Sequence, residues 1–338
     1  MRFTLSDDQQ EIKRTARDLL ASRATVARVR ENAEAARYDD ALWKELCELG
    51  WPGIALAEEH GGQGLGMVEL CALLEELGYA CAPVPMLGSV LAGLAIQQAG
   101  SDAQRERWLG GLAHGELRGA LGLVRDGVAD LVPDAGGADV VVLIDAAAGS
   151  ASLVEGDAVE AVDAIDATRR HGRVSAGGEA LEGDAEAALD RALVAVAAEL
   201  VGVSQRALDM TLDFVKERKQ FGVPVGSFQA VQHRAAQMLL DVEGGRSATY
   251  FAAWTADAEP DRLPVAAAMA KAWTSDGARN ATGGAIQLHG GIGFTWEADV
   301  HWWYKRAQLG AHYLGDASAH RARIAELVAA QRGAAAPA

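Results

Sequence analysis

Apolar residues recur roughly every three to four positions through most of residues 1–115, which predicts a series of amphipathic helices. Ser6-Asp7-Asp8 can cap the first helix, whose apolar positions include Ile12, Ala16, Leu19 and Leu20. The other helices predicted here span Tyr38 to Leu49, Glu69 to Tyr79, Pro85 to Ala99, and Gln104 to Leu112. A glycine-rich loop covers residues 58–66. We therefore predict a helical N-terminal domain over residues 1–116.

The pattern changes near residue 117, where Val, Gly, Asp and Ala become frequent. Residues 138–144 form a continuous apolar run typical of a buried strand, and residues 151–154 predict another strand. Gly-Gly pairs at 136–137 and 177–178 indicate turns between strands. Residues 117–184 are therefore predicted to form a small β domain.

Helical periodicity returns at Ala185 and continues almost to the end of the chain. It predicts long helices at about 185–216, 229–256, 264–286 and 298–331, the last broken near Gly310. Long helices joined by short loops favour an antiparallel four-helix bundle, over residues 185–333. The Ala/Pro tail at 334–338 is expected to be frayed. The fold class is therefore mainly α with a small β domain.

Composition limits the classes of function that the chain can have. The 338 residues carry a formal charge of -16, which argues against nucleic acid and anionic membrane surfaces as partners. A local basic pocket for a phosphate-bearing ligand remains compatible with this charge. No apolar run reaches membrane-spanning length and no secretory segment follows Met1, so a cytoplasmic protein is expected. Cys47, Cys71 and Cys81 match no metal-ligand spacing, so we expect reduced core thiols and no metal.

Residues 217–233 interrupt the helical pattern with side chains suited to a phosphate. Arg218 can donate two hydrogen bonds to a phosphate, and Gln220 can bond the polar edge of a cofactor. Phe221 can pack on a planar ring, and the helix that begins near Gln229 has a positive end that favours an anion. The alternative is an exposed loop between helices with a surface arginine.

A second break, Gln287-Leu288-His289-Gly290-Gly291-Ile292-Gly293-Phe294, follows the third long helix of the predicted bundle. Its glycines would allow backbone amides to approach a ligand closely. The alternative for this segment is a simple helix C-cap.

The order and spacing of these segments resemble the acyl-CoA dehydrogenase family along almost the whole chain. Further matching segments are Pro52-Gly53, residues 59–64, residues 75–78, and Phe228-Gln229-Ala230-Val231-Gln232-His233. The resemblance implies an N-terminal helical domain, a middle β domain and a C-terminal four-helix bundle. It also implies FAD as cofactor, self-association, and removal of two hydrogens from Cα and Cβ of an acyl-CoA thioester, with an electron-transfer flavoprotein as electron acceptor by analogy.

By the same resemblance, several residues would hold the adenosine-diphosphate half of FAD bound by a neighbouring subunit. They are Arg218, Gln220, Phe221, Gln229, Gln287, Gly290 and Gly291.

The chain departs from the family in the parts that serve the flavin ring and the chemistry. A Thr-Glu-Pro-type segment and a Trp-containing strand are missing, because residues 121–127 run almost directly into residues 131–139. Leu314 stands where the family has its catalytic Glu, and Ala192 stands at the alternative position for that base. Asp316 and Asp190 are the remaining candidates, so the sequence leaves the catalytic residue unknown. The alternative for Asp316 is a helix N-cap.

Three other groups invite a functional interpretation but have simpler ones. We expect the aromatic residues Trp296, Trp302, Trp303 and Tyr304 to be core and interface residues. Glu199 is expected to be a polar residue of the bundle, and residues 166–170 to cap a β turn, with a role in binding coenzyme A or at an interface as the alternative.

Three functions remain open at this stage. The first is the accessory subunit of a heteromeric acyl-CoA dehydrogenase, as in the α2β2 members of actinobacterial steroid side-chain degradation. In that case the partner subunit supplies the flavin-ring site and the base. The second is a self-sufficient homomeric dehydrogenase with a displaced carboxylate such as Asp316. The third is a non-enzymatic scaffold of the same fold. The acyl group and the identity of the partner are not readable from the chain.

Overall fold

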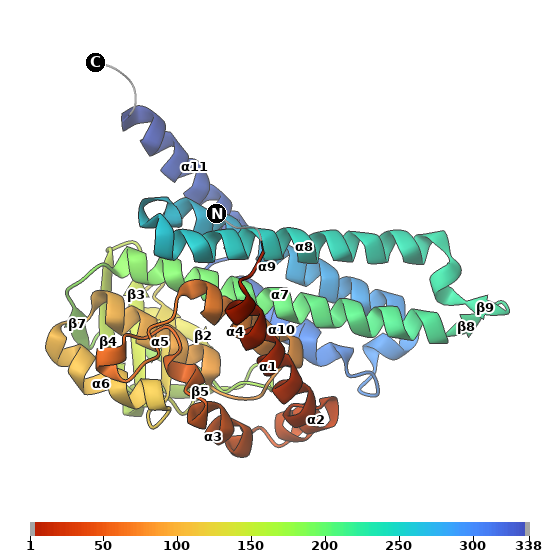
Figure 1. Ribbon diagram of the computed structural model, residues 1–338, viewed down its shortest axis with the longest axis horizontal. Helices are drawn as coiled ribbons and strands as arrows, with labels where there is room; N and C mark the ends of the chain where they lie inside the picture. The colour runs from red at the N-terminus through yellow and green to blue at the C-terminus, as the bar shows by residue number, and fades with distance from the viewer. Residues whose placement is uncertain (1–3, 335–338) are drawn as a thin grey trace.

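The computed structural model describes residues 4–334 and is mainly helical (Figure 1). Its N-terminal helices are α1 (Asp7–Arg23), α2 (Val26–Glu34), α3 (Asp40–Glu48), α4 (Met67–Ala80), α5 (Met86–Ala99) and α6 (Asp102–His114), with short 3₁₀ turns η1 (Trp51–Gly53) and η2 (Glu58–His60). The predicted cap of the first helix is confirmed, since the Ser6 hydroxyl accepts a hydrogen bond from the Gln9 backbone N–H at 3.2 Å. The sequence analysis missed α2, which buries Val29, Asn32 and Ala33.

Two small sheets form a β layer beside these helices. A four-stranded sheet has the order β1-β3-β4-β7 and a three-stranded sheet has the order β2-β6-β5. The strands are β1 (Gly119–Leu123), β2 (Val128–Val132), β3 (Val140–Asp145), β4 (Ser150–Glu155), β5 (Glu160–Val162), β6 (His171–Ser175) and β7 (Glu179–Leu181). The two predicted strands correspond to β3 and β4, whereas the other strands were not predicted. Strands β5 and β7 have only three residues, and β2 and β6 contain exposed charged residues, so these four carry no continuous apolar run. Strand β1 is buried, but its two glycines are unfavourable in strands.

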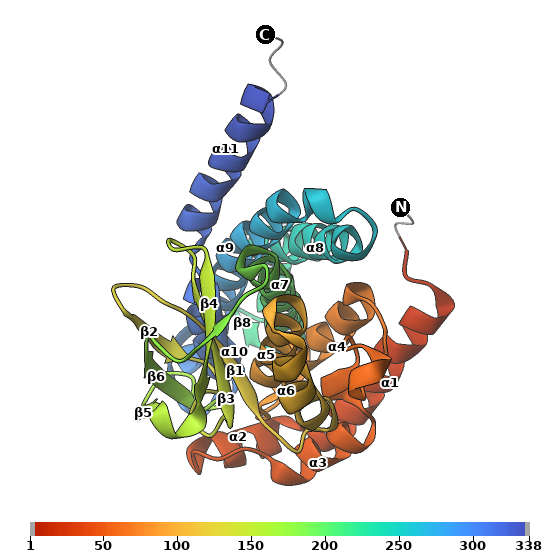
Figure 2. The same ribbon diagram turned by 90° about the vertical axis from the view of Figure 1, so that its left-hand side faces the viewer.

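Helix α5 connects the β layer to the helical core. All but two of its residues are buried, so its sequence lacks a polar face. The Ser89 hydroxyl accepts a hydrogen bond from the Gly119 backbone N–H at the start of β1, and the Asp134 carboxylate accepts one from the Gly88 N–H at 2.9 Å. Figure 2 shows α5 between the sheets and the other N-terminal helices. The β layer is therefore fixed to the helices by both apolar and polar contacts.

The C-terminal part is built on long helices that pack side by side (Figures 1 and 2). They are α7 (Ala185–Glu217), α8 (Gln229–Ala258), α9 (Leu263–His289) and α10 (Val300–His312), with the turns η4 (Val225–Ser227), η5 (Pro260–Arg262) and η6 (Gly290–Phe294) between them. Helix α4 crosses α7 closely at two glycines: a Cβ on Gly202 would lie 1.8 Å from the Glu75 carbonyl oxygen, and one on Gly78 would lie 2.2 Å from that of Glu199. The bundle is therefore packed tightly against the N-terminal helices.

The predicted helix break near Gly310 was misplaced. Gly310 lies inside α10, where a Cβ would come within 2.9 Å of the Leu200 side chain, so this glycine serves close packing. The chain leaves the helix after His312, because Leu314 (φ 58°) and Gly315 (φ 102°) adopt left-handed backbone conformations. The next helix, α11 (Ala317–Ala334), packs on α9 and extends away from the bundle (Figure 2). Apart from Ala334, the tail predicted to be frayed lies outside the described residues.

Candidate functional site

One end of the bundle brings the two segments singled out in the sequence together. The Phe214 ring in the last turn of α7 stacks on the His289 ring at the end of α9, with 4.5 Å between ring centroids. The segment with Arg218 follows α7, and the glycine-rich turn η6 follows α9. Figure 1 shows this end of the bundle, with the small hairpin of β8 (Lys219–Gln220) and β9 (Val223–Pro224) projecting from it. The two segments therefore share one surface.

The hairpin presents its functional side chains to solvent. Arg218 is the C-cap of α7, and its carbonyl accepts a hydrogen bond from the Val225 N–H at 2.8 Å, which closes the hairpin. Within residues 4–334 the Arg218 guanidinium has no hydrogen-bond or ion-pair partner. Phe221 is at the tip with a left-handed backbone (φ 53°) and an exposed fraction of 93%. Gln220 and Gln229 are also exposed, so these side chains can contact a molecule outside the chain.

The glycine-rich turn leaves open space above its backbone. Gly290 ends α9 with φ 65° and ψ -145°, a conformation that only glycine adopts readily. A Cβ added at Gly290 or Gly291 would meet nothing within 4 Å. Gln287, one turn before, is exposed. Guanidinium, carboxamide and bare backbone thus face outward from one end of the molecule, and such groups can bind a phosphate-bearing ligand.

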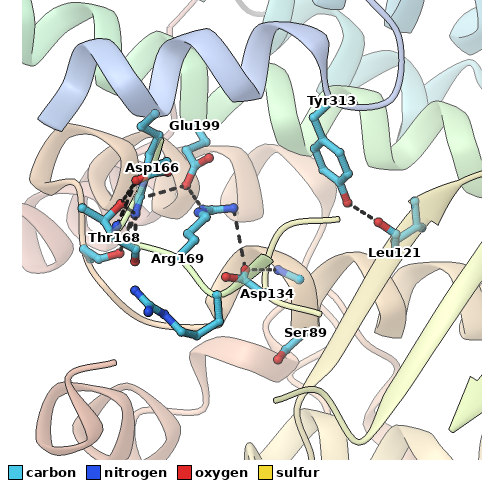
Figure 3. A network of polar contacts seen from close by, with 12 residues as sticks. Ser89, Leu121, Asp134, Asp166, Thr168, Arg169, Glu199 and Tyr313 are labelled. Atoms are coloured by element: carbon cyan, nitrogen blue, oxygen red, sulfur yellow. Dashed lines mark hydrogen bonds and ion pairs between the residues drawn. The ribbon is translucent and has the colours of Figure 1, made fainter. Parts of the chain in front are cut away.

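The position of the family base has no acid. Leu314 lies in the turn between α10 and α11 with an exposed fraction of 3%, and it lines a cavity of about 480 Å³ against β1 and β2. The Tyr313 hydroxyl donates a hydrogen bond to the Leu121 carbonyl at 2.5 Å, which joins this turn to β1 (Figure 3). The alternative position, Ala192, is fully buried. Neither residue can accept a proton.

The two candidate replacement carboxylates already have partners. Asp316 caps α11, because its carboxylate accepts a hydrogen bond from the Ala319 N–H at 2.9 Å, and this bond lowers its pKa. Asp190 is 1% exposed and pairs with Arg323 at 2.5 Å. Burial raises the pKa of Asp190, although Arg323 opposes the shift. In this structure the Asp316 side chain therefore acts as a helix N-cap.

A buried network of charges fills the space between the three parts of the chain (Figure 3). Arg306 of α10 lies 3.3 Å from the Asp166 carboxylate and 3.6 Å from that of Glu199 on α7. Arg169 also pairs with Glu199, and it lies 3.6 Å from Asp134. Glu199 is therefore held between two guanidiniums and has a structural role.

The turn at residues 166–170 belongs to the same network. The Thr168 N–H donates a hydrogen bond to the Asp166 carboxylate at 3.0 Å, as the predicted turn cap requires. Asp166 is 2% exposed, and Arg306 and His171 lower the pKa of its carboxyl against the effect of burial. The Asp166 and Thr168 side chains are paired with each other and with Arg306, whereas the Nε atoms of Arg169 and Arg170 have no hydrogen-bond partner among the described residues.

The aromatic residues of residues 296–304 divide into two groups. Trp302 and Trp303 are buried core residues as predicted, and the Trp303 indole N–H donates to the Tyr79 carbonyl at 2.9 Å. Trp296 was also expected to be a core or interface residue, but it is 67% exposed in the single chain, because it precedes α10 in the loop after η6.

The three cysteines are free. Residues 4–334 contain no cluster of three or more potential metal ligands and no helix long and apolar enough to span a membrane.

Two protein-family models and several known proteins match most of this chain. The family model for the acyl-CoA dehydrogenase N-terminal domain matches residues 6–116, and that for the C-terminal domain matches residues 183–329. The acyl-CoA dehydrogenase IpdE2 of Mycobacterium tuberculosis is 37% identical, with 92% of this chain and 94% of that protein covered.

Two solved structures share the fold closely. The Tcur3481-Tcur3483 steroid ACAD gives a TM-score of 0.87 at 31% identity, covering 98% of this chain and all of that chain. The ChsE4-ChsE5 complex from Mycobacterium tuberculosis gives 0.88 at 26% identity, with both chains fully covered. From these matches, and from an architecture of N-terminal helices, a small β layer and a C-terminal bundle, the chain belongs to the acyl-CoA dehydrogenase family.

Proposed function

We propose that this chain is the accessory subunit of a heteromeric, FAD-dependent acyl-CoA dehydrogenase. It would hold the adenosine-diphosphate half of an FAD whose ring site and catalytic base belong to the partner subunit. The observation that carries this proposal is the contrast between the residues suited to the adenosine-diphosphate half of FAD and the residue at the position of the base. The residues suited to a diphosphate are exposed and open, whereas the base position is occupied by the buried, apolar Leu314.

The residues on both sides of this contrast support the proposal for physical reasons. Arg218 would donate to the phosphates, Gln220, Gln229 and Gln287 would bond polar groups, and the Gly290–Gly291 backbone would allow close approach. Bound FAD supplies the hydride-accepting flavin ring. The β layer of this chain lacks the segments that grip that ring in the family, and Asp316 is a helix cap.

The interior gives further support. The buried carboxylates of Asp134, Asp166 and Glu199 are paired with Arg169 and Arg306, so none of the three is free to replace the missing base. The names of two structural neighbours each join two components, and one of them is a steroid ACAD. We therefore propose a second subunit of the same family as partner and an acyl-CoA, such as a steroid-CoA, as substrate.

Arg218→Ala in the assembled heteromer tests the proposal. Loss of a charge-assisted contact should weaken FAD binding by roughly ten- to one-hundredfold. Flavin absorbance per heteromer after gel filtration measures this loss. Arg14→Ala is the matched control, because Arg14 is an exposed arginine on α1 that pairs only with Glu11 on the same helix. Unchanged flavin content in the Arg218 variant would refute the shared site and favour the scaffold alternative.

A further inference from the structure

We propose that the turn between α10 and α11, residues 311–316, is a pH-sensitive switch controlled by Lys271 of α9. The neutral Lys271 amine keeps this turn closed on α9, and protonation of the amine favours an open turn. The turn carries Leu314 and forms one wall of the cavity of about 480 Å³ beside β1 and β2, so its opening changes the shape of that cavity. The switch requires neither FAD nor a partner subunit, so its test is independent of the proposed function.

Lys271 joins α9 to the turn from inside the protein. The residue has an exposed fraction of 0%. Its Nζ atom lies 3.1 Å from the Ala311 carbonyl oxygen and 2.8 Å from the Gly315 carbonyl oxygen. The last carbonyls of a helix lack partners within that helix, so Lys271 supplies donors that the end of α10 needs. The two contacts lie on either side of Leu314 in the sequence.

The contacts of Lys271 suit a neutral amine. No carboxylate of residues 4–334 lies within 4.0 Å of its nitrogen, and a buried charge without a counter-charge is costly. A neutral amine has two N–H donors, one for each carbonyl, and one lone pair. The Ser275 hydroxyl oxygen lies 2.8 Å from the nitrogen, and a hydroxyl can donate to this lone pair. Burial lowers the pKa of Lys271 to about 7, although Asp316 opposes the shift.

The turn has an unfavourable backbone conformation that its contacts must hold. Leu314 has φ 58°, a left-handed value that is uncommon for residues other than glycine. Such a conformation persists only where the surrounding structure fixes it. Lys271 and His320 hydrogen-bond three carbonyls of the turn, and the Tyr313 hydroxyl bonds the turn to β1. Weaker contacts from Lys271 therefore favour opening.

Other ionisable groups near the turn lie on α10 and α11. His320 is neutral at pH 7, because burial, together with the charge of Lys271, lowers its pKa to about 4. Asp316 caps α11, and this hydrogen bonding lowers its pKa. His312 is exposed at the end of α10. In the closed turn, His320 and Asp316 therefore keep one charge state between pH 6.5 and pH 8.5.

Two ion pairs account for further charges on α7, α9 and α11. Asp190 of α7 pairs with Arg323 of α11, and Asp276 of α9 pairs with Arg321 of α11. Helix α8 approaches this part of α9 through two glycines, which carry no charge. Within the described residues, none of these groups gives Lys271 a carboxylate partner.

Proton linkage gives the direction of the switch. In an open turn Lys271 contacts water and regains the ordinary lysine pKa of about 10.4. The open form therefore binds more protons than the closed form between about pH 7 and pH 10, so closing becomes more favourable as the pH rises. Below about pH 7 both forms are protonated, and the equilibrium stops changing through this group. The opening constant should be on the order of twentyfold larger at pH 6.5 than at pH 8.5.

Hydrogen–deuterium exchange of the purified full-length chain tests the switch. Peptides that cover residues 311–316 are followed at pH 6.5 and pH 8.5, and each rate is divided by the intrinsic exchange rate at that pH. We expect roughly twentyfold higher protection of the turn at pH 8.5. Peptides from α6, in the N-terminal part of the chain, are the internal control and should show no such difference.

Lys271→Met keeps most of the side-chain volume but cannot bind a proton. Protection of its turn should change by about twofold or less between the two pH values, which is the share expected from His320. Lys44→Met is the matched control, because Lys44 is an exposed lysine on α3. His312→Gln removes the exposed histidine of the turn. Both control variants should keep the pH dependence of the wild type.

A titration of the unaltered chain keeps the test independent of whether Lys271→Met folds. Among the ¹³Cε resonances of lysine, one should titrate with a midpoint near pH 7. It should persist in Lys305→Met, which removes another lysine whose pKa is lowered by burial. A lowest lysine midpoint above pH 9 in that variant, equal protection of the turn at both pH values, or an unchanged pH dependence in Lys271→Met would overturn the proposal.

Discussion

Replacing Arg306 by methionine should destabilise the protein more than any surface substitution. The Arg306 side chain is 2% exposed and lies 3.3 Å from the Asp166 carboxylate and 3.6 Å from that of Glu199. Its guanidinium also donates to Thr168 and to the Ala82 carbonyl. Methionine keeps most of the volume but removes every donor. Asp166 would then retain only its contacts within the 166–168 turn.

The magnitude follows from the burial of the remaining charge. Removing one partner of a buried ion pair costs about 3–5 kcal/mol, because the other charge stays in the interior. The unfolding entropy of a chain of 338 residues is roughly 0.7 kcal/mol per kelvin if it unfolds as one unit. The melting temperature should therefore fall by about 4–7 °C.

Circular dichroism at 222 nm during heating measures this change. Arg321→Met is the control, since its pair with Asp276 is exposed and should contribute about 1 kcal/mol or less. Asp166→Asn in the Arg306→Met background removes the uncompensated charge and should recover part of the loss. An Arg306 variant as stable as the Arg321 control would refute the claim that the interior charges hold the three parts of the chain together.

Two further predictions concern the turn that carries Leu314. Asp316→Asn should leave heteromer activity and FAD content unchanged, because asparagine caps helices as well as aspartate; abolished activity with FAD retained would instead support the displaced-base alternative. His320 is 5% exposed and hydrogen-bonds the Leu314 carbonyl at 3.0 Å, and burial lowers its pKa to about 4. The unfolded chain protonates this histidine near pH 6.5, so stability should fall by roughly 2–3 kcal/mol between about pH 7 and pH 4.5. Urea titrations should show a weaker decrease for His320→Gln, and an unchanged pH slope would contradict the assignment.

The bundle was predictable because its helices are long and strongly periodic. The ends of α7, α8 and α9 differ from the predicted ones by three residues or fewer. The break near Gly310 was misplaced because glycine suggests a helix stop, whereas here it makes room for Leu200. Most strands of the β layer were missed, because their pairing partners, not their own sequences, define them. The division into three domains remains our interpretation.

The candidate site was only partly predictable. The absence of a base at Leu314 follows from comparison with a motif, and the exposed positions of Arg218 and Gly290 agree with contacts to a neighbour. The contacts of Glu199 were not predictable, because Arg169 and Arg306 lie far from it in sequence.

The central claim is that this chain holds FAD only together with a partner. The most direct measurement is the flavin absorbance and native mass of the chain purified alone and after coexpression with a second acyl-CoA dehydrogenase subunit. The proposal predicts a colourless chain alone and a yellow heteromer with one FAD per pair of subunits. A yellow homo-oligomer with about one FAD per chain and acyl-CoA dehydrogenase turnover would contradict it.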